Sequence, residues 1–202
     1  MKKALYIFLI IIALALTYLK FNYGGEVSPA PSPIPSPVVV ASPIPMVRSF
    51  TTDYFTLEYP VEASAAAESE GIDFHSWRIY FMGDKQRASG RTQTELFDGY
   101  AVSLTRFEGV GEELERTQAE ADQQGIIDAC GKENVTDIVS KKYLARQILT
   151  FFGGCLGEAD YYYFVERDHL YRITSMVVGE DLDKEKYQVT VERILTSLKF
   201  TD

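Results

Sequence analysis

The chain has 202 residues, of which 46% are hydrophobic, and this length suits one domain of ordinary size with additional segments. Residues 47–202 contain 17 basic and 28 acidic residues and carry a net charge of −11, whereas the preceding residues are weakly basic. Because an acidic domain disfavours phosphate contacts, this composition argues against nucleic-acid binding and against lying flat on anionic lipid.

The first segment of the chain is a membrane signal. An apolar run without a charged residue extends from Ala4 to Leu19, directly after Lys2 and Lys3. Counted to Tyr23, a helix here spans roughly 30 Å at ~1.5 Å per residue, which matches the hydrocarbon core of a bilayer. We therefore expect residues 1–23 to be a retained anchor, with a cleaved signal peptide as the alternative. In both cases the basic start stays cytoplasmic and the remainder lies across the membrane.

A proline-rich linker follows over residues 24–46. Seven of the chain's eight prolines lie in residues 26–45, alternating largely with serine and alanine. Proline fixes φ and removes amide donors, so this segment is expected to stay extended, reaching on the order of 60 Å at ~3.1 Å per residue. It predicts a semi-rigid spacer between membrane and domain, or a disordered joint with no required length.

Period-two alternation of apolar and polar residues dominates the globular part, residues 47–202. It predicts seven strands, at 54–60, 76–82, 99–107, 136–140, 143–152, 160–166 and 170–178. Residues 61–71 are expected to be a connection without firm structure. A tight turn is expected at Arg167, Asp168 and His169.

Two helices are expected among these strands. The first covers residues 112–124, has a thin apolar stripe through Leu114 and Ala121, and ends at Gly125. The second covers about 184–198 with Asp183 as N-cap. Its apolar stripe has helical spacing and consists of Val191, Ile194, Leu195 and Leu198. These elements predict an α+β fold, with a mostly antiparallel sheet of about six or seven strands packed with helices.

Three stretches carry a resemblance to a known family. They are "DYFTLEYP" at 53–60, "YYYFVERDHLYRITSM" at 161–176 and "VERILTSLKF" at 191–200. Together they resemble the PsbP family, named for an extrinsic protein of the oxygen-evolving photosystem. The resemblance implies an antiparallel sheet between helical layers and an accessory or assembly role outside a membrane. A tryptophan that many members have soon after the first-strand proline is missing here, and no metal or binding residue is transferred.

Cys130 and Cys155 are the only cysteines. In the oxidising surroundings expected for this domain they predict a disulfide, which would close a loop of about 25 residues and stabilise the fold by roughly 3 to 4 kcal/mol. A redox-active pair is disfavoured because catalytic dithiols usually lie two residues apart. Two unpaired thiols are the other alternative.

Other candidate sites are weaker. His75 and His169 lack any metal or triad spacing, so we assign no catalytic residue, metal site or cofactor and expect surface or hairpin histidines. The acidic segment 179–185 is expected to favour the start of a helix. Tyr161 and Tyr163 share one face of a strand and form a candidate aromatic binding face.

The leading hypothesis is a non-enzymatic extracytoplasmic domain, tethered to the cell membrane by residues 1–23, that binds a protein or another envelope component. One alternative is an envelope hydrolase or transferase with a site assembled from scattered strand and loop residues. Another is a structural subunit of a surface assembly. The sequence leaves the partner and the oligomeric state open.

Overall fold

The computed structural model describes residues 46–71, 73–92, 95–108, 112–143, 145–154 and 157–201. The anchor expected over residues 1–23 and all of the expected linker except Met46 lie outside these residues and stay predictions, as do the domain boundaries. Within the described ranges, no helix is both long enough and apolar enough to cross a bilayer.

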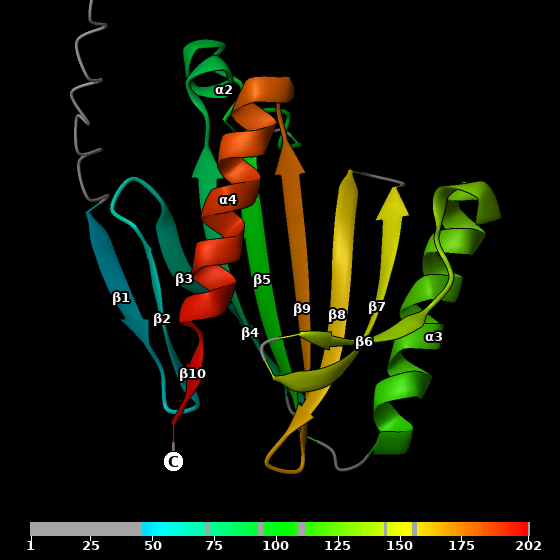
Figure 1. Cartoon of the computed structure of the whole chain (residues 1–202). Coiled ribbons are helices and arrows are strands. Elements are labelled where there is room, and N and C mark those ends of the chain that lie inside the picture. Colours follow the sequence, from blue (N-terminus) through cyan, green and yellow to red (C-terminus); the bar gives the residue numbers. More distant parts are fainter. Residues whose placement is uncertain are drawn as a thin grey trace, which may run out of the picture. The chain divides into compact units, whose positions relative to one another are not determined.

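Seven antiparallel strands form the main sheet, in the spatial order β3-β4-β5-β9-β8-β7-β6 (Figure 1). The strands are β3 (Ser64–Glu70), β4 (Phe74–Met82), β5 (Gly99–Phe107), β6 (Val139–Tyr143), β7 (Arg146–Gly154), β8 (Glu158–Glu166) and β9 (His169–Val178). Their registers align apolar positions on one face, so that Trp77 opposes Leu104, which in turn opposes Ile173. The predicted α+β fold with a mostly antiparallel sheet is confirmed.

A second, small sheet contains β1 (Val47–Thr51), β2 (Phe55–Pro60) and β10 (Lys199–Phe200), in the order β1-β2-β10. β2 corresponds to the strand predicted at 54–60, but it pairs with β1 and β10 and has no place in the main sheet. Phe55 and Leu57 are nevertheless buried, because this sheet packs its apolar side chains into the same core as α4 and the main sheet.

The two long helices pack on opposite faces of the main sheet. α4 (Asp181–Ser197) buries Val191, Ile194 and Leu195 against one face, as the apolar stripe predicts. α3 (Glu112–Cys130) packs on β7, β8 and β9 at the other face, where Ala119 is fully buried (Figure 1). Two short helices, α2 (Asp84–Ala88) and η1 (Lys132–Asn134), lie in connections. The structure is therefore layered, with one helix on each side of the main sheet.

Two segments differ from the secondary structure that the sequence predicts. Residues 61–71, expected as a connection, contain the edge strand β3, with an irregularity between Ala67 and Ser69. Alanine and serine have weak strand preferences, and pairing with β4 supplies the hydrogen bonds that hold them extended. The strand predicted at 136–140 lies three residues later, as β6 (Val139–Tyr143).

The helix boundaries also differ. α3 continues through Gly125 to Cys130, because Ile126 beyond the glycine packs against the sheet and this tertiary contact outweighs the poor helix preference of glycine. α4 begins at Asp181 with Glu180 as N-cap, three residues before the predicted start at about 184 and the predicted N-cap Asp183. The expected turn after β8 consists of Arg167 and Asp168, both with positive φ, while His169 already belongs to β9.

Candidate functional site

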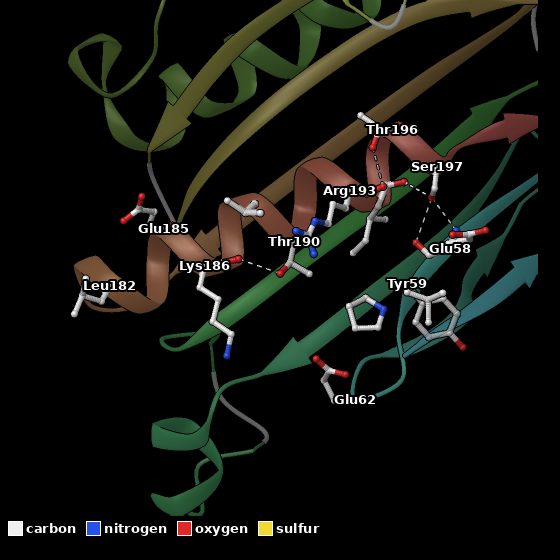
Figure 2. Close-up of a pocket in the computed structure, with 14 residues that line it drawn as sticks. Glu58, Tyr59, Glu62, Leu182, Glu185, Lys186, Thr190, Arg193, Thr196 and Ser197 are labelled. Carbon is white, nitrogen blue, oxygen red and sulfur yellow. Dashed lines mark hydrogen bonds between the residues drawn. The ribbon is translucent and has the colours of Figure 1, made fainter. Parts of the chain in front are cut away.

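A groove of about 770 Å³ runs between α4 and the β1–β2 part of the small sheet (Figure 2). One wall is the side of α4 that faces away from the main sheet, from Leu182 to Ser197. The other wall consists of Val47, residues 58–60 and Glu62, which follows β2. The groove therefore exists because the apolar stripe of α4 rests on the main sheet while its flank faces a separate sheet.

Exposed apolar side chains gather in this groove. Leu182 is 84% exposed, Val47 52% and Val189 49%, and all three line it. They are three of the seven large hydrophobic residues that are exposed in the described part of the chain. Exposed apolar surface that gathers at a hollow and is rimmed by polar residues is typical of an interaction site.

Charges of both signs border the groove. Lys186 and Arg193 extend from α4, and Glu58 and Glu62 lie on the wall formed by the small sheet and the turn after it (Figure 2). Within the described residues none of these four side chains takes part in an ion pair. The groove thus combines exposed apolar side chains with charged groups outside any described ion pair, on both of its walls.

Hydrogen bonds tie the C-terminal end of α4 to β2. The backbone N–H of Glu58 donates to Ser197 Oγ at 2.8 Å, and Ser197 Oγ lies 3.3 Å from the carbonyl oxygen of Glu58 and 2.7 Å from that of Ile194 (Figure 2). These contacts satisfy a backbone donor of β2 that has no partner in β10, because β10 begins only at Lys199, opposite Thr56. They fix the width of the groove at this end.

A buried polar network fixes the other end of α4. Asp98, which is 2% exposed, accepts hydrogen bonds from the backbone N–H of Lys85 at 2.9 Å and from the hydroxyl of Tyr187 at 3.0 Å. Gln86 is fully buried, and its Oε1 accepts from the backbone N–H groups of Phe97 and Asp98. A Cβ at Gly83 would lie 2.2 Å from Asp98 Oδ2, so only glycine fits there.

Burial and the hydrogen bond to Asp98 raise the pKa of Tyr187 to about 12. Nearby, the ammonium group of Lys85 lies 2.8 Å from Glu180 and 2.9 Å from Asp183, and these two carboxylates raise the pKa of Lys85. The acidic segment 179–185 thus begins α4, as the sequence predicts. No cluster of three or more metal-binding side chains occurs among the described residues.

Of the two cysteines predicted to form a disulfide, one lies within the described residues and the other does not. Cys130 is the last residue of α3, whereas Cys155 lies outside the described residues, so the pairing stays a prediction. The loops around them are neighbours, because Val135 forms a β-bridge with Gly153 and the backbone N–H of Thr136 donates to Phe152 O at 2.9 Å.

The two tyrosines of the candidate aromatic face have different surroundings. Tyr163 is fully buried under α3 and donates a hydrogen bond to Asp122 at 2.7 Å; burial is the main cause of its raised pKa. Tyr161 is half-buried, stacks on Phe151 with ring centroids 4.7 Å apart, and lines a hollow beside α3. Of the pair, Tyr161 alone can reach a ligand from solvent, and a binding role for it stays a prediction.

Both histidines contact the same ion pair at one end of the main sheet. His75 Nε2 lies 3.3 Å from Glu108 Oε1, and His169 Nε2 lies 2.8 Å from Arg106 Nη2, while Arg106 also pairs with Glu108. The sequence gives no signal for this convergence, because the four residues come from β4, β5, β9 and the residue after β5. A hollow of about 210 Å³ beside His169 is lined by described residues that include no serine or cysteine.

The groove residues were also not singled out by the sequence. Leu182 and Val189 are apolar residues outside the buried stripe of α4, and that mismatch is the one signal that could have identified them. The network of Asp98, Gln86 and Gly83 has no local sequence signature.

Comparisons with known proteins give a fold-level similarity. No family model and no curated protein matches the chain. Among solved structures, it is similar to cyanobacterial PsbP (CyanoP) from Synechocystis sp. PCC 6803, with 10% identity and a TM-score of 0.46 over 82% of this chain and 100% of that one. This similarity agrees with the resemblance that the sequence pattern predicts, and at this identity and TM-score no argument about function rests on it.

Proposed function

We propose that the chain is a membrane-tethered, extracytoplasmic binding domain that captures a segment of a partner protein in the groove between α4 and the small sheet. The observation that carries the proposal is the coincidence of exposed apolar side chains with free charges of both signs in one hollow. Keeping apolar side chains exposed loses the stabilisation of burial, and covering them on binding recovers it.

The dimensions of the groove favour an extended peptide segment as the occupant. The wall from Leu182 to Thr196 comprises 14 helical steps, or about 21 Å at ~1.5 Å each. An extended chain covers that length with roughly six residues at ~3.3 Å each. Lys186 and Arg193 on one wall and Glu58 and Glu62 on the other can pair with a segment that carries both signs of charge.

The tether rests on the sequence outside the described residues. The apolar run from Ala4 to Leu19, the basic residues before it and the proline-rich linker support an anchored domain that projects away from the cytoplasm. The predicted disulfide between Cys130 and Cys155 fits this location, since such bonds persist in oxidising compartments. The neighbouring loops around both cysteines support the pairing.

A non-enzymatic role is part of the proposal. The hydrolase alternative requires a hollow in which a histidine meets a carboxylate and a nucleophilic serine or cysteine. The hollow beside His169 has the first two groups, and the described residues around it supply neither serine nor cysteine. The groove, with its exposed apolar side chains and charges of both signs, supports binding as the proposed function.

Crosslinking in intact cells tests the proposal. The full chain, with a C-terminal affinity tag, is treated with a membrane-impermeant crosslinker, and the products are identified by mass spectrometry. Val189→Glu places a charge on the exposed apolar part of the α4 wall of the groove. The matched control is Val139→Glu, since Val139 is 52% exposed and lies on β6, outside the groove, whereas Val189 is 49% exposed within it.

We expect a protein that crosslinks to the wild type and to Val139→Glu and is lost with Val189→Glu. Equal capture by both variants would contradict the groove as the binding surface. Capture in lysed cells but never in intact cells would contradict the extracytoplasmic location. If a small molecule co-purifies with the wild type and shields the groove from the crosslinker, the occupant of the groove is that molecule and not a peptide.

A further inference from the structure

The face of the main sheet that carries α3 is covered over part of its width. α3 packs mainly on β7, β8 and β9 on this side, and β4 and β5 face it only across the hollow described next. Where the covered part ends, a hollow of about 440 Å³ opens between α3 and the strands. It lies on the opposite side of the main sheet from α4, so an inference about it does not rest on the proposed groove function.

Hydroxyl groups line the floor of this hollow. They come from three neighbouring strands and belong to Ser76, Ser103, Thr105 and Thr174. Ser76 Oγ lies 3.3 Å from Thr105 Oγ1, so one of these two hydroxyls donates to the other. Ser103 and Thr174 have no side-chain hydrogen bond to any described residue. The floor therefore offers several groups that can both donate and accept.

The charges at the rim are balanced. Arg172 Nη1 donates to Asp122 Oδ2 at 2.8 Å, and Glu68, the remaining charged lining residue, pairs with Arg78 at 3.1 Å. No positive charge is left over for an anion. Arg172 Nε is buried and has no hydrogen-bond partner within the described residues, so a ligand can reach this guanidinium only through its terminal nitrogens.

Small residues on α3 keep the hollow open. Ala121 and Gly125 lie one turn apart on α3, and both line it. A Cβ at Gly125 would meet no atom within 4 Å, so packing does not require glycine here. Glycine inside a helix costs about 0.5–1 kcal/mol relative to alanine. Gly125 thus lowers helix stability although packing does not require it. A glycine at this position leaves the hollow open to a ligand.

We propose that this hollow binds a neutral saccharide. Neighbouring sugar hydroxyls can accept from Arg172 and donate to Asp122 while further hydroxyls exchange hydrogen bonds with Ser103 and Thr174. The half-buried ring of Tyr161, one face of which stacks on Phe151, lines the hollow and can contact the apolar C–H groups of a pyranose. A neutral polyol fits the balanced charges better than a phosphate does.

The test uses the full chain in a detergent without a sugar headgroup, observed by ¹H–¹⁵N NMR. Maltotriose and chitotriose are the saccharide probes, and inorganic phosphate is the anion probe. We expect at least one trisaccharide to shift the signals of Ser103, Gly125 and Thr174 saturably, with a Kd on the order of 1 mM. Phosphate is expected to leave these signals unchanged.

Two variants of α3 separate binding from folding. Gly125→Leu fills the hollow, and because leucine favours helix more than glycine does, the helix is not weakened. Ala129→Leu introduces the same side chain at an exposed position of α3 that does not line the hollow. Gly125→Leu is expected to weaken saccharide binding at least about tenfold, and Ala129→Leu is expected to bind as the wild type does.

Three results would overturn the inference. One is the absence of shifts with both trisaccharides. Another is a phosphate-induced shift of the same signals, which would make the hollow an anion site. The third is unchanged saccharide binding in Gly125→Leu, which would place the bound sugar elsewhere on the protein.

Discussion

The two faces of the main sheet are covered to different extents. On one face, α4 and the small sheet enclose a continuous apolar core that includes Trp77, Val102 and Ile194. On the other face, α3 covers an apolar cluster around Leu149 and Phe151, and a polar hollow opens beside it. The first face stabilises the fold, whereas the second combines a smaller core with accessible polar groups.

This difference follows from the two helices. α4 presents Val191, Ile194 and Leu195 in one stripe, whereas α3 is rich in glutamate and glutamine and fully buries Ala119. A helix with few large apolar residues cannot cover a wide sheet face. The strands in the uncovered region carry serine and threonine on this face, and water or a ligand can form hydrogen bonds with their hydroxyl groups.

Replacing a core side chain with alanine on each face tests this comparison. These substitutions are expected to have the largest effect on the free energy of unfolding. Ile194→Ala removes a side chain that is 1% exposed and should lower the free energy of unfolding by about 4 kcal/mol. Leu114→Ala in α3 should lower the free energy of unfolding by only about 1–2 kcal/mol, because the Leu114 side chain is already partly exposed to water. Chemical denaturation measures both values, and equal costs would contradict the contrast between the faces.

The predicted disulfide should contribute somewhat less to the free energy of unfolding than the Ile194 side chain does. If Cys130 and Cys155 are bonded, reduction should lower the free energy of unfolding by about 3 kcal/mol, because the loop of about 25 residues regains its freedom in the unfolded chain. Alkylation of the unfolded protein with and without prior reduction checks the bond. Equal uptake of the label in both samples would rule the disulfide out.

The polar network at the start of α4 should have an intermediate effect. Asp98→Ala leaves the Tyr187 hydroxyl and the backbone N–H of Lys85 without their acceptor, so we expect a loss of about 2 kcal/mol in denaturation experiments. Asp137→Ala, at an exposed position, should change stability by less than about 0.5 kcal/mol. A loss at Asp98 no larger than that at Asp137 would show that the network does not hold α4.

High pH should weaken the α4 face gradually, and this is the smallest expected effect. Burial and Asp98 raise the pKa of Tyr187 from 10.0 to about 12, and burial raises the pKa of Tyr162 to about 12. Since the fold favours the neutral phenols, their contribution is complete below pH 10 and is lost as the pH rises through about 12. Tyrosinate absorbance measured together with unfolding follows this loss, and Tyr187 ionising at pH 10 in the folded protein would contradict it.

Local patterns predicted much of the fold. The spacing of Val191, Ile194 and Leu195 is sufficient to place α4, and alternation is sufficient to locate most strands. The small sheet could not be predicted in this way, because β2 joins β10 through the pairing of Thr56 with Lys199 at the other end of the chain. No local window contains both strands.

The candidate sites were harder to predict than the fold. Val189 is an ordinary exposed residue of α4 until the small sheet supplies the opposite wall of the groove. Likewise, Ser76, Ser103 and Thr174 read as the polar half of alternating strands, and they form the floor of a hollow only because α3 stops short of them. Both sites depend on where a helix lies across a sheet, which is a property of tertiary packing.

The most direct test of the central claim, an outward-facing groove occupied by a partner, is cysteine labelling in intact cells of the native host. Val189→Cys and Val139→Cys are compared with a membrane-impermeant maleimide, first in cells and then in the purified protein. We predict that Val139→Cys reacts in both settings, whereas Val189→Cys reacts fast only after purification removes the partner. Equal reaction of both variants in cells, or reaction of Val139→Cys only after lysis, would contradict the claim.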